Sequence, residues 1–97
     1  MFARATRLEG SPGQLDDAIR QFREQTLPAA QGQPGFGGGM LLADRSSGAA
    51  LAVTLWETEG NMRDSEQFAN QQRSQVASTA GASSEPRVER YEVVVPL

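Results

Sequence analysis

The side chains of this sequence that we consider first as candidates for chemistry are the indole of Trp56, the guanidinium of Arg4 and the hydroxyl of Tyr91. Trp56 ends an apolar run, and its indole can form one wall of a pocket and donate a single hydrogen bond. Arg4 lies two residues from Thr6, and a guanidinium beside an acidic hydroxyl group favours the ionised oxygen. The ordinary alternatives are core or interface packing for Trp56 and partial burial on a strand for Tyr91, whose hydroxyl could otherwise serve a pocket.

A second basic residue near the other end of the chain could join Arg4. Arg90 and Glu92 alternate in the same way as Arg4 and Thr6, so pairing of the first and last strands could bring all four together. The ordinary interpretation is a cross-strand pair of arginine and glutamate, which contributes a few tenths to about 1 kcal/mol. The other interpretation is a cationic site that favours a substrate anion.

Two residue types that dominate active sites are absent from all 97 residues. Without histidine the chain has no ordinary near-neutral general base and lacks the commonest ligand for metals and haem. Without cysteine it has no disulfide, thiolate metal site or thiol nucleophile. We therefore expect no metal and no cofactor. Nine basic residues are dispersed in a chain of net charge -3, which argues against nucleic acid as a partner.

The length indicates a single domain over residues 1–97 with a thin core. No apolar run approaches the roughly 20 residues that cross a bilayer, and residues 1–4 do not resemble a secretory leader. We expect a cytoplasmic protein without a membrane partner.

Periodicity predicts a strand over Phe2–Leu8 and then a helix. Ser11 and Gln14 are spaced as a capping box around a proline at the first helical position. The helix has an apolar stripe, and Pro28 should end or kink it, with a further turn possible over residues 29–32. The stripe consists of Leu15, Ala18, Ile19, Phe22 and Thr26.

The middle of the chain predicts a β-hairpin, with strands over residues 37–44 and 49–57 and a loop that ends in Gly48. The glycines of residues 35–39 are not a phosphate loop, because they precede a strand and no Lys-Ser or Lys-Thr pair follows. They favour a bulge or a close approach of the backbone.

A second helix should begin after Thr58 as the capping residue and run to about Thr79. Its stripe is weak, and Met62 and Phe68 are core residues beneath it or, alternatively, pocket-lining ones. Residues 87–95 predict the last strand. The order of elements is typical of an α+β, ferredoxin-like βαββαβ domain, with a four-stranded antiparallel sheet and two helices on one face.

Both phases of the predicted strands are apolar. Strand residues Leu51, Val53 and Leu55 alternate with Ala50, Ala52 and Trp56, whereas a sheet with one wet face needs apolar residues in one phase only. An exposed patch of that kind marks an interface. We therefore expect a homodimer that buries about 1,500 Å² or more between two sheets. The alternative is a monomer with some exposed alanines and valines.

Several short segments of the sequence resemble those of the antibiotic biosynthesis monooxygenase-like family of the dimeric α/β-barrel superfamily. They are residues 2–7, Leu27-Pro28, Gln33-Pro34-Gly35-Phe36, the hairpin of residues 44–48 and Leu55-Trp56-Glu57-Thr58. The resemblance covers the whole chain and implies a homodimer with a pocket between sheet and helices. Members often carry a histidine in the second helix, which binds iron in the haem-degrading branch, and its absence from residues 62–79 argues against haem degradation by that route.

Some relatives oxygenate polycyclic phenols without metal or flavin, others degrade haem, and many have no assigned activity, so the resemblance alone does not select a reaction. We expect cofactor-independent oxygenation of an aromatic or polyketide-like molecule, with Trp56 and Arg4 as catalytic residues. The ligand-binding residues would be Thr6, Phe22, Met62, Phe68 and Tyr91. An enzyme of this kind should contain an apolar pocket of about 300 Å³ or more. The alternative is a non-catalytic dimeric module that binds a metabolite or a protein.

Overall fold

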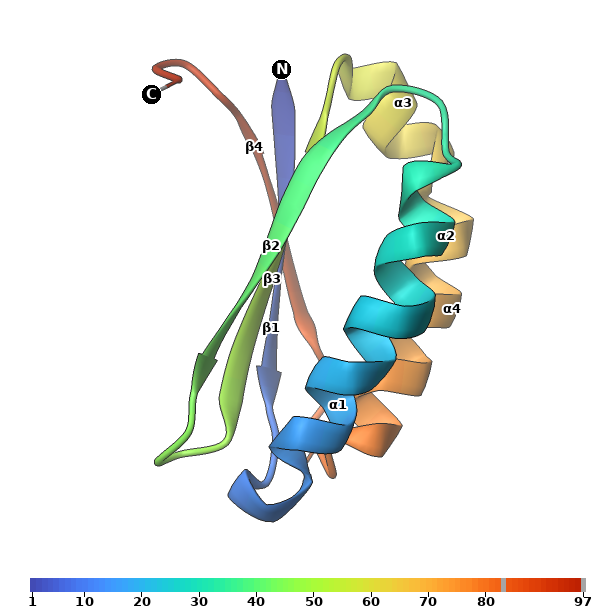
Figure 1. Cartoon of the computed structure of the whole chain (residues 1–97). Helices are drawn as coiled ribbons and strands as arrows, with labels where there is room; N and C mark the ends of the chain where they lie inside the picture. Colours follow the sequence, from blue (N-terminus) through green and yellow to red (C-terminus); the bar gives the residue numbers. More distant parts are fainter. Residues whose placement is uncertain (83, 97) are drawn as a thin grey trace.

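The computed structural model describes residues 1–82 and 84–96, which form one antiparallel sheet with helices on one of its faces (Figure 1). The strand order is β2-β3-β1-β4. This is the predicted ferredoxin-like α+β architecture. In chain order the elements are β1 (Phe2–Glu9), η1 (Pro12–Gln14), α1 (Leu15–Gln21), η2 (Phe22–Thr26), α2 (Leu27–Gln31), β2 (Phe36–Asp44), β3 (Ala49–Trp56), α3 (Glu59–Asp64), α4 (Glu66–Thr79) and β4 (Arg87–Glu92).

The first helical segment passes through Pro28 instead of ending there. The turn over Phe22–Thr26 is a π-helix, and the amide of Leu27 donates to the carbonyl of Phe22, five residues back. The wider turn absorbs the missing N–H of proline and relieves its ring from the preceding carbonyl. The helix therefore continues to Gln31, and two side chains of the π-turn, Phe22 and Thr26, line a cavity.

The start of this segment also differs from the prediction. Ser11 makes no side-chain capping bond, and a 3-10 turn begins the helix because the amide of Gln14 donates to the backbone carbonyl of Ser11 at 3.0 Å. The predicted capping box is therefore wrong. The amide of Ser11 instead donates to the carbonyl of Ala80 at 2.9 Å, which ties this turn to the end of α4.

The second helix is interrupted at Ser65, so the predicted single helix is two helices, α3 and α4. Its predicted cap is confirmed, since the amide of Asn61 donates to the Thr58 hydroxyl at 3.0 Å. The last strand ends at Glu92 and not at Val95, although the amide of Val93 still donates to the carbonyl of Met1 at 2.8 Å.

The hairpin of β2 and β3 has the loop glycine and the β-bulge that the sequence predicts. Gly48 adopts a φ of 84°, and a β-carbon there would lie 2.6 Å from the carbonyl oxygen of Gly10. The predicted bulge lies between Phe36 and Gly38, where the pairing of β2 with β3 shifts. The bulge brings Phe36 opposite Trp56, on the face of the sheet that meets the helices.

The main core lies at one end of the space between sheet and helices. It comprises Leu8, Leu15, Ala18, Ala50, Val76, Ala77 and Ala80. The opposite sheet face leaves Met40 and Leu42 about half exposed, at 54% and 48%. Within the described residues, no helix has the length and apolar character needed to span a bilayer.

Candidate functional site

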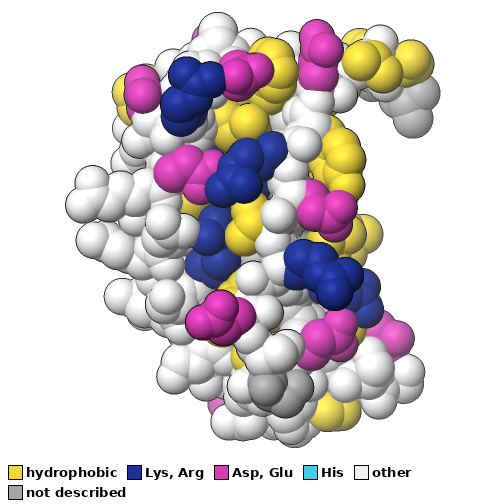
Figure 2. Space-filling view, turned by 180° about the vertical axis from the view of Figure 1, so that it is seen from behind, with side chains coloured by type: hydrophobic (Ala, Val, Ile, Leu, Met, Phe, Trp, Pro, Cys, Tyr) yellow, Lys and Arg dark blue, Asp and Glu magenta, His cyan; other side chains and the backbone are white. Residues whose placement is uncertain are grey.

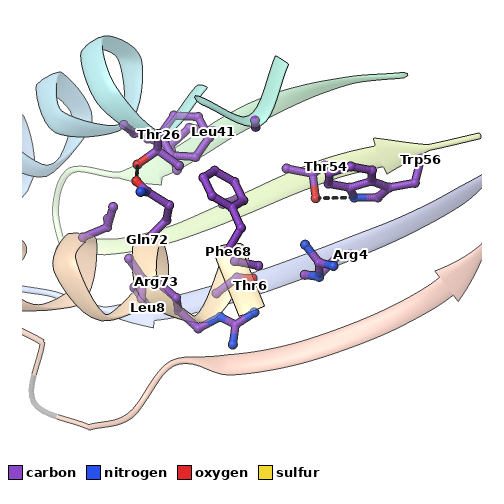
Figure 3. A pocket seen from close by; sticks show the side chains of 15 residues that line it. Arg4, Thr6, Leu8, Thr26, Leu41, Thr54, Trp56, Phe68, Gln72 and Arg73 are labelled. Carbon is purple, nitrogen blue, oxygen red and sulfur yellow. Dashed lines mark hydrogen bonds between the residues drawn. The ribbon is translucent and has the colours of Figure 1, made fainter. Parts of the chain in front are cut away.

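A cavity of about 70 Å³ lies between the sheet and the two helical segments, beside the main core. Figure 3 shows the ring of Phe68 standing in its middle, between Leu41 and Arg4. The lining is mostly apolar, with polar groups at its ends: Arg4, Thr6, Leu8, Phe22, Thr26, Ala30, Leu41, Ala52, Thr54, Trp56, Phe68, Ala69, Gln72, Arg73 and Val76. The predicted volume of about 300 Å³ was wrong, because Phe68 occupies the space.

Arg4 reaches this cavity from β1 and is 4% exposed. Its Nη2 donates to the carbonyl of Met62 at 2.5 Å and to the hydroxyl of Ser65 at 2.7 Å. Ser65 is itself buried, and its hydroxyl donates to the Met62 carbonyl at 2.7 Å. The break between α3 and α4 therefore supplies the acceptors that hold this guanidinium in place.

Trp56 orients the same guanidinium from β3. The Arg4 guanidinium carbon lies 5.5 Å from the centre of the indole, within the range of a cation–π contact. The indole N–H donates to the hydroxyl of Thr54 at 3.0 Å, and Phe36 packs edge-on against the ring with centroids 5.5 Å apart. Trp56 is 1% exposed, so it both fills the core and forms the cavity wall.

Three arginines surround a single carboxylate at this end of the sheet. Glu66 accepts from Nε of Arg90 at 2.5 Å and lies 3.4 Å from Nη2 of Arg4. The Arg90 hydrogen bond holds the pKa of Glu66 below its ordinary value. Arg73 on α4 also interacts with Glu66, and burial lowers the pKa of Arg4 and of Arg73. Even so, guanidinium groups stay protonated at neutral pH.

The carboxylate partner of Arg4 is not the one expected. Across the sheet Arg4 lies opposite Arg90, and Glu92 lies opposite Phe2. The expected cross-strand pair of arginine and glutamate therefore does not involve Arg4 and Glu92, because the register places two arginines opposite each other. Glu66 from α4 relieves their repulsion.

The arrangement of sheet and helices matches a group of solved structures. One is a monooxygenase from the gene ActVA-Orf6 of Streptomyces coelicolor, solved with Nanaomycin D, which superposes with a TM-score of 0.76 at 16% identity, covering 99% of this chain and 92% of that one. Another is SnoaB, a cofactor-independent oxygenase from Streptomyces nogalater, with a TM-score of 0.70 at 15% identity over 99% and 95% of the chains. This chain has the fold of the antibiotic biosynthesis monooxygenase-like proteins.

Other comparisons leave the activity open within the monooxygenase-like fold. The haem degrader MhuD of Mycobacterium tuberculosis gives a TM-score of 0.74 at 20% identity over 100% of this chain and 99% of that one. No family model matches. Two uncharacterized proteins of Mycobacterium tuberculosis, Rv2557 and Rv2558, are 33% and 34% identical over 93 and 95 residues. This chain covers 96% and 98% of its own length there but spans only 41% and 39% of those relatives.

The predicted site residues divide between two places on the monooxygenase-like fold. Arg4, Thr6, Phe22, Trp56 and Phe68 all line the cavity. The other two, Met62 and Tyr91, line a separate open groove of about 700 Å³ between α3 and the edge strand β4. Figure 2 shows the face of the molecule on which α4 and β4 lie, with basic and acidic side chains down its middle.

Tyr91 does not reach the cavity because of its strand phase. It pairs with Ala3, whose side chain is out of phase with Arg4, and its hydroxyl donates to Glu89 on the same strand. Its side chain is 54% exposed. Met62 is buried, but its contribution near the cavity is the backbone carbonyl that accepts from Arg4.

Sequence reasoning missed the polar residues that α4 contributes. Ser65, Gln72 and Arg73 are polar residues of a helix whose apolar stripe is weak, and none was among the predicted site residues. A three- and four-residue spacing runs through the whole set, which is Ser65, Phe68, Ala69, Gln72, Arg73 and Val76. That spacing is the signal that could have found them, because it places polar and apolar residues on one face.

Proposed function

We propose that this protein is a cofactor-independent oxygenase that acts on the anion of a small aromatic molecule. The observation that carries the proposal is Arg4, a guanidinium that is 96% buried at an apolar cavity. Its Nε is buried and has no hydrogen-bond acceptor among the described residues. A cation held in this way stabilises a phenolate or enolate more than the neutral molecule.

The proposed reaction needs no group beyond the substrate and dioxygen. The substrate loses a proton, and its anion gives one electron to dioxygen, forming a radical and superoxide. Their combination makes a carbon–oxygen bond and a peroxide anion, which takes up one proton from solvent in place of the proton first lost. The resulting hydroperoxide loses water, so that a CH₂ group and O₂ become a carbonyl and H₂O. Arg4 stabilises the anion, Trp56 orients Arg4, and apolar lining residues such as Phe22 and Leu41 exclude water from the aromatic ring.

The cavity restricts which substrates qualify. Among the residues that the structure describes, its lining includes no carboxylate, and the lowered pKa of Glu66 keeps that nearby group ionised and a weak base. The substrate must therefore be acidic enough to ionise near neutral pH once it lies beside Arg4. It must also displace Phe68, because about 70 Å³ is less than the roughly 150 Å³ cavity that accepts benzene.

The direct test is oxygen consumption with 1,8-dihydroxyanthrone, an acidic phenolic ketone with a reactive CH₂ group. We expect enzyme-dependent uptake of one O₂ for each anthraquinone formed. A Trp56→Phe variant should be about tenfold slower, because the cation–π contact to Arg4 weakens and the bond to Thr54 is lost. Uptake equal to that of a protein-free control, or a Trp56→Phe variant as fast as wild type, would contradict the proposal.

The small cavity favours a second candidate, a module that binds an aromatic metabolite without transforming it. That function needs neither a base nor dioxygen, and it uses the same cationic end of the cavity. Saturable binding of 1,8-dihydroxyanthrone under nitrogen, with no oxygen uptake in air, would support this module over the oxygenase.

We further propose that the functional unit is a homodimer joined through the outer sheet face. This face presents Met40, Leu42, Val53 and Leu55, and an apolar sheet surface of this extent is covered in stable proteins. A lysine in place of Val53, at the centre of the face, should halve the mass measured by sedimentation equilibrium. The control is Gln25→Lys on the exposed side of the π-turn, which should sediment as the wild type. A wild type that sediments as a folded single chain at micromolar concentration would eliminate the dimer.

A further inference from the structure

Arg73 on α4 is a cavity residue with buried hydrogen-bond donors that lack partners. Its Nη1 donates to the side-chain oxygen of Asn70, one turn back on the same helix. Its Nε and Nη2 are buried, and neither meets an acceptor within residues 1–82 and 84–96. Buried donors are almost always satisfied in folded proteins, and a charged donor left alone is especially unfavourable. The arrangement therefore calls for an acceptor from outside the chain.

Arg4 has the same deficit at the same cavity. It is 4% exposed, and its Nε also lacks an acceptor among the described residues. Figure 3 shows Arg73 reaching from α4 toward the strand that carries Thr6 and Arg4, and the two guanidinium groups are close enough to repel each other. Two residues that line the cavity, one on β1 and one on α4, thus carry buried N–H groups without an acceptor among the described residues.

The charges around this end do not balance. Arg4, Arg73 and Arg90 interact with one another and with a single carboxylate, that of Glu66. Glu66 is hydrogen-bonded to Arg90 and lies near Arg4, and within the described residues Arg73 forms no ion pair with a carboxylate. The surplus of positive charge is partly buried, where an anion would be attracted strongly.

We propose that Arg73 and Arg4 form an anion subsite for a flat, apolar ligand that carries one delocalised oxyanion, either a carboxylate or an ionised phenol. A planar guanidinium matches two oxygens of such a group, and the rest of the cavity is built for a hydrocarbon ring. The apolar lining comprises Leu8, Phe22, Leu41, Phe68 and Val76. The inference deepens the proposed function, on which it rests for identifying this ligand as the substrate.

The test compares benzoate with benzamide, a neutral molecule of the same shape, by isothermal titration calorimetry. Wild type should bind benzoate at least about tenfold more tightly than benzamide, because charge-assisted hydrogen bonds are strong in a buried site. Arg73→Met should remove most of this preference and leave benzamide binding unchanged. Arg20→Met removes an equal charge from α1, where Arg20 is exposed and paired with Asp17, and should keep the preference.

A Phe68→Ala variant removes the ring that a ligand must displace from the cavity. The preference can therefore be measured in this variant even if the wild type binds both probes weakly. The preference for benzoate should persist in Phe68→Ala and disappear in Phe68→Ala/Arg73→Met. Thermal melting shows that each variant is folded, and Arg73→Lys, which retains the charge, should recover part of the preference. Equal binding of the two probes, or no binding of either to Phe68→Ala, would overturn the subsite.

The visible absorbance of 4-nitrophenolate distinguishes the two kinds of oxyanion. Excess protein should shift the ionisation of 4-nitrophenol to lower pH if the site takes phenolates, and Arg73→Met should cancel that shift. Binding of benzoate without this shift assigns the subsite to carboxylates. The subsite stands if benzoate is preferred while no phenolic compound consumes oxygen, and then only the oxygenase fails. If oxygen is consumed but benzoate is not preferred over benzamide, the oxygenase stands and the anion subsite fails.

Discussion

Glutamine in place of Glu66 is expected to lower the free energy of unfolding by about 3 kcal/mol near neutral pH. Glu66 is the carboxylate that Arg4 and Arg90 share, and without it the buried Arg4 faces Arg90 and Arg73 uncompensated. The estimate is at the lower end for a broken buried ion pair, because Glu66 keeps 23% of its side-chain exposure. Urea unfolding at a fixed protein concentration measures it.

This loss should depend on pH in a defined direction. The pKa of Glu66 lies below its ordinary value of 4.5, chiefly because of the Arg90 hydrogen bond. Its stabilising contribution is therefore complete above that ordinary value and disappears as the pH falls through the lower pKa of the folded state. The difference between wild type and Glu66→Gln should shrink in acid.

Glu59→Gln is the matched control for that experiment. It removes one carboxylate from an exposed pair with Arg63 on α3, and should cost only a few tenths of a kcal/mol. If Glu66→Gln were no more destabilising than Glu59→Gln, Glu66 would not offset the repulsion among the three arginines, and the proposed stabilising role of this carboxylate would be wrong.

Methionine in place of Arg4 is expected to reduce kcat/KM for oxygen consumption at least about 100-fold, the effect of removing one charge-stabilising donor from an active site. The protein should still fold. Methionine fills a similar volume, Glu66 keeps its bond to Arg90, and Ser65 keeps its bond to the Met62 carbonyl. Exchanging a buried charge for an apolar side chain is often tolerated for this reason.

The Arg4 result is interpretable only beside two other variants. Arg4→Lys keeps the charge but not the planar group that stacks on Trp56, so intermediate activity is expected. Arg20→Met should match the wild type, since that arginine is 59% exposed on α1. A folded Arg4→Met protein with wild-type turnover would show that this guanidinium has no part in the reaction.

Local patterns in the chain predicted the elements and much of their composition. Alternation placed Arg4, Thr6 and Leu8 on one side of β1, and all three face the helices. The hairpin with Gly48 at its end, the bulge beside Phe36 and the cap at Thr58 were also predictable, because each depends on a few neighbouring residues. The fold class followed from the order of these elements.

Contacts between residues of different strands and helices could not be predicted from local patterns. Periodicity gives the phase of a residue within its own strand or helix, but not the offset between one element and the next. The pairing of β4 with β1 sets Arg4 opposite Arg90 and turns Tyr91 away from the cavity, and packing of the side chains fixes that offset. At Pro28 and Ser65 the observed helices differ from the predicted ones for a related reason. Contacts with the rest of the molecule determine whether a helix is widened, as near Pro28, or interrupted, as at Ser65.

The residue types and their local spacing were enough to predict a ferredoxin-like sheet, a shared strand phase for Arg4 and Thr6 and a tryptophan at the end of β3. The convergence of Arg4, Glu66 and Arg73, and the cavity that Phe68 nearly fills, appear only when α4 is laid across the sheet. Hydrogen bonds and charges act over a few ångströms, and residues far apart in sequence come within that range only through packing of the core.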